Sequence, residues 1–287
     1  MSLAYLNGNW LPLEQAQVSV LDRGFLFGDG VYEVIPVYDG RPLRLEQHLQ
    51  RLQDSLDGIR LKNPLDVTHW RALIAELIQR SGAGNQLLYL QITRGSAPRD
   101  HAFPPAGTIP TVFLSSKGFN PPDDARFEQG VRVGLTEDPR WQLCKLKTVN
   151  LLANVLLKQV AVDEGLDEML LHANQQLTEG TSSNLFVVRD GVIATPPLSD
   201  NILPGITRGL IVELARQAGF KVEERAIALA ELDHADEIWI SSSTRELMPV
   251  IAIASHPVAN GTPGPIARQL QQAFRTYALQ SSTAAAA

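Results

Sequence analysis

Residues 143–152, LCKLKTVNLL, place Lys145 and Lys147 directly before a run of residues that predicts a helix. A lysine that enters a cavity at the end of a strand is desolvated, which lowers its pKa from about 10.4 and frees the amine for Schiff-base chemistry. For an arbitrary lysine, a solvated side chain is the more common outcome. Because the two lysines are two positions apart, both face the same side of an extended segment. The stretch raises the question of which amine, if either, is a reagent.

The composition of the chain bounds its class. The chain has 287 residues, of which 44% are apolar, so it can form either one large domain or two smaller ones. The formal net charge of -6 and the scattered basic residues argue against nucleic-acid binding, which requires clustered positive charge. The single cysteine, Cys144, excludes an intramolecular disulfide and a thiolate-rich metal site. No apolar run reaches membrane-span length and no signal peptide is evident, so we expect a cytoplasmic protein.

Several common site motifs are absent from the sequence. There is no G-x-G-x-x-G after a strand, no phosphate-loop lysine, no H-E-x-x-H and no G-x-S-x-G. The six histidines are dispersed without ligand spacing, so we expect no metal site. A Ser–His–Asp hydrolase is disfavoured because no serine stands on a predicted strand-to-helix elbow.

The first third of the chain alternates strand and helix patterns. Asn7-Gly8 is a strong two-residue turn signal and predicts a hairpin. Residues 30–40 are rich in β-branched and aromatic side chains and predict a strand. Pro36 within it indicates an edge or a bulge, since proline cannot donate to the ladder. Apolar spacing predicts helices at 45–59 and 68–82, and strands follow at 86–95 and 111–116.

The stretch around residues 118–125 is dense in turn formers and predicts a linker between two domains. We therefore expect an N-terminal domain at 1–117 and a C-terminal domain at 126–280, with a disordered tail at 281–287. Within the second domain, a long helix follows the lysine pair and residues 168–197 predict three strands with tight turns. A helix at 205–220 and a strand–turn–strand unit at 237–253 complete the pattern.

Three separated stretches carry the groups that, with a lysine amine, a pyridoxal phosphate site requires. Glu179 precedes small residues in TEGTSSN (178–184), whose amides and hydroxyls suit an anion. LPGITRG (203–209) opens a helix, where free amides and the helix dipole favour phosphate. SSST (241–244) crowds hydroxyls into one turn. Each stretch alone is more often a cap or a turn, so composition gives only a weak indication.

Taken in order, five motifs resemble one family. They are DRGFLFGDGVYEV, KTVNLLANV, EGTSSNLFVV, LPGITR and SSSTRELMPV. This order is similar to that of the fold-type IV (class IV) pyridoxal-phosphate aminotransferases, and the resemblance covers roughly residues 4–278. It implies an α+β fold with a small α/β N-terminal domain and a larger pseudo-barrel C-terminal domain. The family includes branched-chain aminotransferases, D-amino-acid aminotransferases and aminodeoxychorismate lyases.

The resemblance also implies roles for single residues. Lys147 matches the Schiff-base lysine, whereas Lys145 departs from the family pattern and is expected to be exposed or beside the site. Glu179 matches the glutamate against the pyridine nitrogen, which makes the pyridoxal phosphate ring an electron sink. The remaining positions that match contacts to the phosphate or the ring are Arg51, Ser182, Ser183, Leu203, Ile206, Thr207, Ser243 and Thr244.

Substrate class depends on residues 93–104, TRGSAPRDHAFP, which carry Arg99 and His101. In isolation this is a surface loop with charged tips. In the D-specific members that the sequence resembles, an R-x-H pair combines with a tyrosine, here Tyr32, to hold the substrate carboxylate. In that group the loop reaches the active site of the neighbouring subunit, which implies a homodimer. Pro36, after Tyr32, leaves the side-chain preference open.

We therefore expect transamination between D-amino acids and 2-oxo acids, of the type D-alanine with 2-oxoglutarate giving pyruvate and D-glutamate. Two enzymes on the same fold stay as alternatives: an L-branched-chain aminotransferase and an aminodeoxychorismate lyase. A non-catalytic protein that binds pyridoxal phosphate is the alternative from another class.

Overall fold

The computed structural model describes the backbone of residues 3–283 and the side chains of residues 3–280. The chain divides into two compact units. The first comprises the chain up to Asn120, Leu146–Leu151 and the residues from Leu279 onward, and the second comprises Pro121–Lys145 and Leu152–Ala278. The domain boundaries expected from the sequence stay a prediction. They differ from this division at residues 146–151 and 279–280, which they assign to the C-terminal domain.

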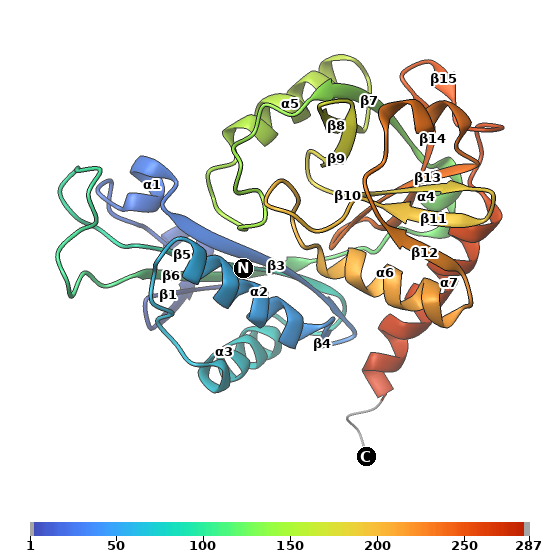
Figure 1. Cartoon of the computed structure of the whole chain (residues 1–287). Helices are drawn as coiled ribbons and strands as arrows, with labels where there is room; N and C mark the ends of the chain where they lie inside the picture. The colour runs from blue at the N-terminus through green and yellow to red at the C-terminus, as the bar shows by residue number, and fades with distance from the viewer. Residues whose placement is uncertain (1–2, 284–287) are drawn as a thin grey trace. The chain divides into compact units, whose positions relative to one another are not determined.

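The first unit is built on a six-stranded sheet with the order β2-β1-β6-β5-β3-β4, in which all neighbours are antiparallel (Figure 1). Its strands are β1 (Leu3–Leu6), β2 (Asn9–Pro12), β3 (Gly30–Tyr38), β4 (Arg41–Pro42), β5 (Gln86–Thr93) and β6 (Thr111–Gly118). Its helical elements are η1 (Leu13–Gln15, 3-10), α1 (Arg23–Phe27), α2 (Leu45–Gly58) and α3 (Val67–Arg80).

Helices α2 and α3 cover one face of this sheet and form the core of the unit with it. Along β5, Leu88, Leu90 and Ile92 are buried in that core, whereas Tyr89 and Gln91 face the other way and are half-buried. The alternation follows from the two-residue period of a strand. The sheet therefore has one dry face and one face available to a site.

Two sequence signals in this unit have the structural outcome expected of them. Asn7 and Gly8 both have positive φ and form the two-residue turn between β1 and β2. Pro36 lies in β3 without a bulge, since the register against β5 is unbroken. On the other side of β3, β4 pairs only with Val37 and Tyr38. Pro36 is thus at a nearly open edge, where its missing N–H breaks no ladder bond.

Residues 146–151 join the first unit because they pair with β3. Thr148 forms an isolated bridge with Val31, and the Val149 amide donates to the Gly30 carbonyl at 3.0 Å. The side chain of Leu146 lies where a Cβ on Gly58 of α2 would stand. Periodicity cannot predict such pairing, because the partners are more than a hundred residues apart.

The second unit is built on a nine-stranded curled sheet of mixed direction (Figure 1). The order is β12-β11-β10-β13-β14-β7-β8-β9, and β15 pairs with β14. The strands are β7 (Val131–Glu137), β8 (Glu168–Ala173), β9 (Gln176–Gly180), β10 (Asn184–Arg189), β11 (Val192–Thr195), β12 (Lys221–Glu224), β13 (Glu237–Ser242), β14 (Glu246–Ile253) and β15 (His256–Pro257). The helical elements are α4 (Asp124–Gln129), α5 (Leu152–Asp163), α6 (Ile206–Gln217), η2 (Leu229–His234, 3-10) and α7 (Pro265–Thr283).

The expectation of three strands in residues 168–197 is wrong, because the structure has four there. Asn174 and Gln175 both adopt positive φ, which makes a tight turn between β8 and β9. Asp190 and Gly191 do the same between β10 and β11. Asn-Gln gives no strong turn signal by composition, so the sequence pattern does not separate β8 from β9.

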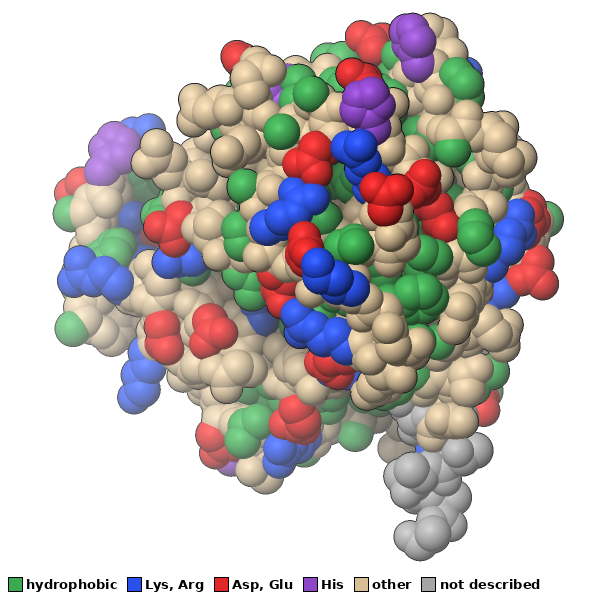
Figure 2. Space-filling view, turned by 45° about the vertical axis from the view of Figure 1, so that its right-hand side comes forward, with side chains coloured by type: hydrophobic (Ala, Val, Ile, Leu, Met, Phe, Trp, Pro, Cys, Tyr) green, Lys and Arg blue, Asp and Glu red, His purple; other side chains and the backbone are tan. Residues whose placement is uncertain are grey.

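The expected disordered tail at 281–287 is partly wrong, since α7 continues to Thr283. Residues 284–287 lie outside the described part of the chain. A bilayer-spanning helix is not found anywhere in residues 3–283. On the face drawn in Figure 2, acidic and basic side chains are interspersed and neither sign gathers into one large patch.

Candidate active site

The two lysines of the opening stretch have different environments. Lys145 is exposed, and its Nζ lies 2.6 Å from Asp200 Oδ1 in a surface ion pair. Lys147 is half-buried, and its Nζ lies 4.2 Å from the centroid of the Tyr32 ring. The backbone of Lys147 is fixed as well: its N–H donates to Ser55 Oγ at 3.1 Å, and its carbonyl accepts from the Tyr32 amide at 2.9 Å. Lys147 is therefore the lysine that the structure holds against a predicted site residue.

Tyr32 lies on the open face of the first sheet. Its ring stacks on that of Tyr89 with centroids 5.8 Å apart, and the Tyr89 hydroxyl donates to Gln91 Oε1 at 2.7 Å. Burial raises the pKa of Tyr89 to about 12, and the neighbouring Tyr32 adds to this. The Tyr89 phenol thus stays protonated at neutral pH as a hydrogen-bond donor.

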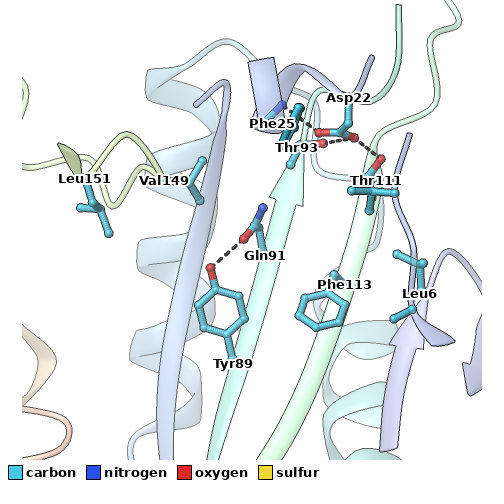
Figure 3. Close-up of a pocket in the computed structure, with 13 residues that line it drawn as sticks. Leu6, Asp22, Phe25, Tyr89, Gln91, Thr93, Thr111, Phe113, Val149 and Leu151 are labelled. Carbon is cyan, nitrogen blue, oxygen red and sulfur yellow. Dashed lines mark hydrogen bonds between the residues drawn. The ribbon is translucent and has the colours of Figure 1, made fainter. Parts of the chain in front are cut away.

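A cavity of about 470 Å³ opens on the same face (Figure 3). Its lining includes Tyr89 and Gln91 of β5 and Phe113 of β6, together with Phe25 and Val149. The charged residue of the lining, Asp22, accepts hydrogen bonds from other residues of the same lining. As Figure 3 shows, the Asp22 carboxylate accepts from Thr93 Oγ1 at 2.9 Å and from Thr111 Oγ1 at 2.7 Å, and it also caps α1 through the Gly24 amide.

Arg51 lies on α2 and is buried against β3. Its Nε and Nη2 donate to the two oxygens of Glu33 at 2.8 and 2.7 Å, and His48 Nδ1 lies 2.7 Å from Glu33 Oε2. Burial opposes ionisation of Glu33, but Arg51 and His48 lower the pKa of this carboxyl to about 2. Burial lowers the pKa of His48. The contact between Arg51 and Glu33 was missed from the sequence, and the phosphate role of Arg51 stays a prediction.

Arg99 and His101 are both exposed and share one aromatic neighbour. The Arg99 guanidinium carbon lies 5.3 Å from the centroid of the Phe27 ring, and the His101 ring centroid lies 5.5 Å from it. The structure thus brings together the two members of the predicted R-x-H pair. Phe27, in the motif DRGFLFGDGVYEV, was not predicted to touch them.

Glu179 lies at the centre of a buried polar network in the second unit. Arg140 Nη1 donates to its Oε1 at 2.6 Å, while the Leu203 amide and Asn184 Nδ2 donate to its Oε2 at 3.1 and 3.2 Å. Burial raises the pKa of Glu179 to about 7, with the Arg140 guanidinium acting in the opposite direction. A buried acid ringed by donors is suited to face a cationic ring nitrogen.

Arg140 and Asp138 are site residues that sequence reasoning missed. Asp138 accepts from Arg140 through both carboxylate oxygens, at 2.8 and 2.7 Å, so one guanidinium bridges Asp138 and Glu179. Two acidic residues and one arginine in EDPRW (137–141), shortly before the lysine pair, were the available signal. A charged pair in a loop is usually a solvated feature, and only the fold shows that this one is buried.

The three predicted phosphate-binding stretches lie in the second unit. Ser182 is exposed and donates to Glu168 Oε2 at 3.2 Å, whereas Ser183 is buried. Ile206 and Thr207 begin α6, whose first turn has no side-chain cap. Asn184, at the start of β10, pairs with Ser241 of β13, which brings the turn at Ser182 and Ser183 beside the one at Ser243 and Thr244.

Glu168 ties these two turns together. It is fully buried on β8 and accepts from Thr181 Oγ1, and Arg245 Nη1 donates to it at 2.5 Å. Arg245 directly follows Thr244. Leu203 is joined to the same region, because Asn184 Nδ2 donates to its carbonyl at 2.9 Å. Glu179 and Leu203 are thus joined through Asn184, and Glu168 joins Ser182 to Arg245 beside Thr244.

Residues 30–253 match the model of the Amino-transferase class IV family. Because the match covers most of the chain, the chain belongs to this family. The fold-type IV, α+β architecture expected from the motifs is thereby confirmed. A branched-chain amino acid aminotransferase from T.th., solved with pyridoxamine 5'-phosphate, superposes with a TM-score of 0.91 at 28% identity, covering 97% of this chain and 94% of that one. The branched-chain amino acid aminotransferase from Escherichia coli gives 0.86 at 27% identity, covering 96% and 93%.

Within the family, curated sequences with greater identity carry another specificity. The D-alanine aminotransferase of Staphylococcus epidermidis is 39% identical over 277 residues, covering 96% of this chain and 98% of that protein. That of Bacillus licheniformis is 36% identical over 276 residues, covering 96% and 97%. The chain is therefore similar in sequence to D-alanine aminotransferases and similar in fold to branched-chain enzymes.

Proposed function

We propose that this protein is a pyridoxal-phosphate-dependent aminotransferase that takes its amino group from D-amino acids and passes it to a 2-oxo acid. Family membership and the D-alanine aminotransferase relatives support the reaction class. The structural observation that carries the proposal is the half-buried Lys147 amine, 4.2 Å from the Tyr32 ring centroid. One segment thus holds the expected reactive amine against the tyrosine expected to meet the substrate carboxylate.

The residues of the second unit fit the cofactor. Ser183 Oγ and Ser241 Oγ are buried without a hydrogen-bond partner among the described residues, so each can bind a further polar group. The first turn of α6, beginning at Ile206, offers uncapped backbone amides, as phosphate requires. Ser182, Thr207, Ser243 and Thr244 would add hydroxyls, and Leu203 would pack on the ring, with Arg51 as a further phosphate ligand.

When bound, pyridoxal phosphate withdraws electrons from the α-carbon of the amino acid and makes its proton acidic. Glu179 would keep its buried carboxylate beside the cationic ring nitrogen, and the Arg140 bridge holds this carboxylate in place. A positive partner lowers the pKa of a buried carboxyl, so Glu179 would be ionised in the loaded enzyme. Lys147 would accept the α-proton of the substrate at Nζ as general base. It would then donate this proton as general acid to complete the transfer of the amino group.

Substrate orientation is assigned to Tyr32, Arg99 and His101. Guanidinium, imidazole and phenol donors that converge on one carboxylate give charge-assisted hydrogen bonds. Arg99 and His101 are exposed on the chain itself. This exposure supports the proposal that they serve the active site of a neighbouring copy.

A homodimer is part of the proposal, and α5 carries the supporting surface. On this helix Leu152, Val155 and Leu156 are 71%, 61% and 60% exposed. With Val160 they follow helical spacing and form one apolar stripe on α5. A stripe of this size is costly in water and is typical of an interface. The α5 stripe is proposed to pack against a second copy of the chain.

The visible spectrum of the purified yellow protein tests the function. D-Alanine should bleach the absorption band of wild type and of Lys145→Ala, and L-leucine should leave it unchanged. Lys147→Ala should alter or lose the band and all turnover. Bleaching by L-leucine alone would point to the branched-chain alternative, and pyruvate release from aminodeoxychorismate would point to the lyase. A protein inert to every donor would indicate the non-catalytic alternative. The expected cytoplasmic location stays a prediction.

A further inference from the structure

The loop at residues 94–104, here called the trap loop, has little regular structure but many anchors. Residues 97–110 contain no helix and no strand. At its start, Gly95 has a φ of 89° and lies so close to the Ile109 carbonyl that a Cβ would collide with it. The Gly95 carbonyl accepts from the Arg23 amide at 2.9 Å. An exposed loop with these contacts is tied to α1 from its first residues.

The side chain of Arg23 makes the central contact. It is 4% exposed, and its Nη1 donates to the carbonyl of Asp100 at 2.6 Å. Asp100 is the residue between Arg99 and His101. The guanidinium of Arg23 also lies 4.8 Å from the Phe27 ring centroid. One buried arginine therefore holds both the backbone between the pair and the ring against which the pair rests.

Asp29 joins Arg23 of α1 to Arg94, the first residue of the trap loop. Its Oδ2 accepts from Arg23 Nε and from Arg94 Nε, both at 2.8 Å. Arg94 Nη2 donates to the Ile59 carbonyl at 2.7 Å, and its guanidinium lies 3.9 Å from the Phe103 ring centroid. Burial opposes ionisation, but the two arginines hold the pKa of Asp29 below its usual value. The trap loop is thus held at its first residue, Arg94, and near its last, where the Phe103 ring packs on Arg94.

We propose that Phe27 and Arg23 are positioning residues for substrate binding, which act by ordering Arg99 and His101 before the carboxylate arrives. This inference rests on the proposed function, in which the pair binds the substrate carboxylate. Long exposed side chains lose rotamer freedom on binding, and a scaffold that restricts them beforehand improves affinity. The Phe27 ring restricts both residues at once, and Arg23 fixes the backbone between them. Neither Phe27 nor Arg23 needs to touch the substrate.

The test compares Phe27→Leu with Phe119→Leu in the loaded enzyme. Phe119 is a matched control: it is half-buried, contacts the Tyr38 ring at 6.1 Å, and lies at the opposite end of the β5–β6 pair. For Phe27→Leu we expect KM for D-alanine to rise on the order of ten-fold while kcat stays within about two-fold. Propionate, which has the carboxylate alone, should bind about ten-fold more weakly by calorimetry. Turnover of ethylamine, which lacks the carboxylate, should not change. Phe119→Leu should leave all these constants at wild-type values.

A double-mutant cycle with Arg99→Gln isolates the coupling. If Phe27 acts through the pair, Phe27→Leu should add little to the KM already raised by Arg99→Gln. Where Phe27→Leu fails to fold, Arg23→Lys replaces it, because lysine keeps the charge but lacks the two separate donor nitrogens, Nε and Nη1, that bond Asp29 and the Asp100 carbonyl.

Three results would overturn the inference. One is an unchanged KM in Phe27→Leu or its replacement while Arg99→Gln raises KM; the proposed function would then still stand. Another is a loss of ethylamine turnover in Phe27→Leu as large as the loss with D-alanine, which would indicate a general structural role for Phe27. The third is an unchanged KM in Arg99→Gln itself, which would remove the pair from the proposed function as well.

Discussion

Arg51 meets Glu33 through two parallel hydrogen bonds, Nε to Oε1 at 2.8 Å and Nη2 to Oε2 at 2.7 Å, with both side chains buried between α2 and β3. Glu33 occupies a position on the helix-covered face of β3, where Val31 and Ile35 are core residues. A carboxylate there is tolerated only because charged donors surround it. The pair is therefore a source of acid-sensitive stability.

Glu33→Gln should cost about 3 kcal/mol of unfolding free energy at pH 7, from the shift between a pKa of 4.5 and one of about 2. The folded-state pKa is depressed, so this stability is complete above pH 4.5 and is lost as the pH falls towards 2. Urea unfolding of both proteins at several pH values measures it, and the difference between them should shrink on acidification. Glu46→Gln is the control: it breaks an exposed ion pair between α2 and Arg71 of α3 and should cost less than about 1 kcal/mol. A difference that did not depend on pH would contradict the assignment.

Glu179 should make the stability of the cofactor-free protein fall as the pH rises, the opposite of the effect of Glu33. Its folded-state pKa is raised from 4.5 to about 7, so folding of the cofactor-free protein favours the protonated form. Relative to Glu179→Gln, the wild type should lose up to about 3 kcal/mol of stability as the pH rises from 4.5 to 7. Thermal unfolding of both cofactor-free proteins across this range measures the difference. Glu137→Gln, at the exposed end of β7, should follow the wild type.

Arg140→Met should weaken cofactor binding. The change leaves the buried Asp138 and Glu179 carboxylates without their shared cation, which raises the pKa of Glu179 further. A neutral Glu179 binds the cationic ring nitrogen less well, so we expect the Kd for pyridoxal phosphate to rise on the order of ten-fold. Fluorescence titration of the cofactor-free protein gives the constant, with the exposed Arg189→Met as the comparison. An unchanged Kd would show that Arg140 is dispensable to the site.

Two glycines near the start of α6 offer a paired test. A Cβ on Gly205 would collide with Asn184 Oδ1, the side chain that also bonds Glu179 and Leu203. Gly205→Ala should therefore destabilise the protein by about 1–3 kcal/mol and reduce its affinity for pyridoxal phosphate. Gly209, one turn later, has open space around its Cβ position, and Gly209→Ala should stabilise the helix by about 0.5–1 kcal/mol. Chemical denaturation of the wild type, Gly205→Ala and Gly209→Ala measures these changes in unfolding free energy. Equal changes in the two variants would refute the steric argument.

The α5 stripe predicts the outcome of a charge insertion. Leu156→Glu should dissociate the dimer, because a carboxylate would be buried without a partner. Sedimentation velocity should show a shift to the monomer, with loss of turnover if Arg99 and His101 serve the neighbouring copy. Leu198→Glu, an exposed leucine outside α5, should keep the assembly. A monomeric wild type would rule out the homodimer directly.

Local patterns were sufficient for most elements. The leucine spacing at residues 45–59 predicts α2 (Leu45–Gly58), and Asn7-Gly8 predicts the first hairpin, because both signals lie within a few residues of the structure they encode. The order of five motifs was enough for the family. The β8–β9 turn escaped prediction, since Asn174 and Gln175 adopt positive φ without a glycine to indicate it.

The chain by itself thus determined most of the elements and the family, and it indicated the candidate site residues other than Asp138 and Arg140. It could not choose between Lys145 and Lys147 on physical grounds, since two residues with the same strand parity look alike in one dimension. The tertiary structure distinguishes their environments, because the 146–151 segment pairs with β3 and lays the Lys147 amine on Tyr32, whereas Lys145 forms an exposed ion pair with Asp200. The Arg140–Glu179 bridge and the shared Phe27 ring were decided in the same way. Both join residues 39 or more positions apart, and burial, which makes such contacts strong, is a property of the folded chain alone.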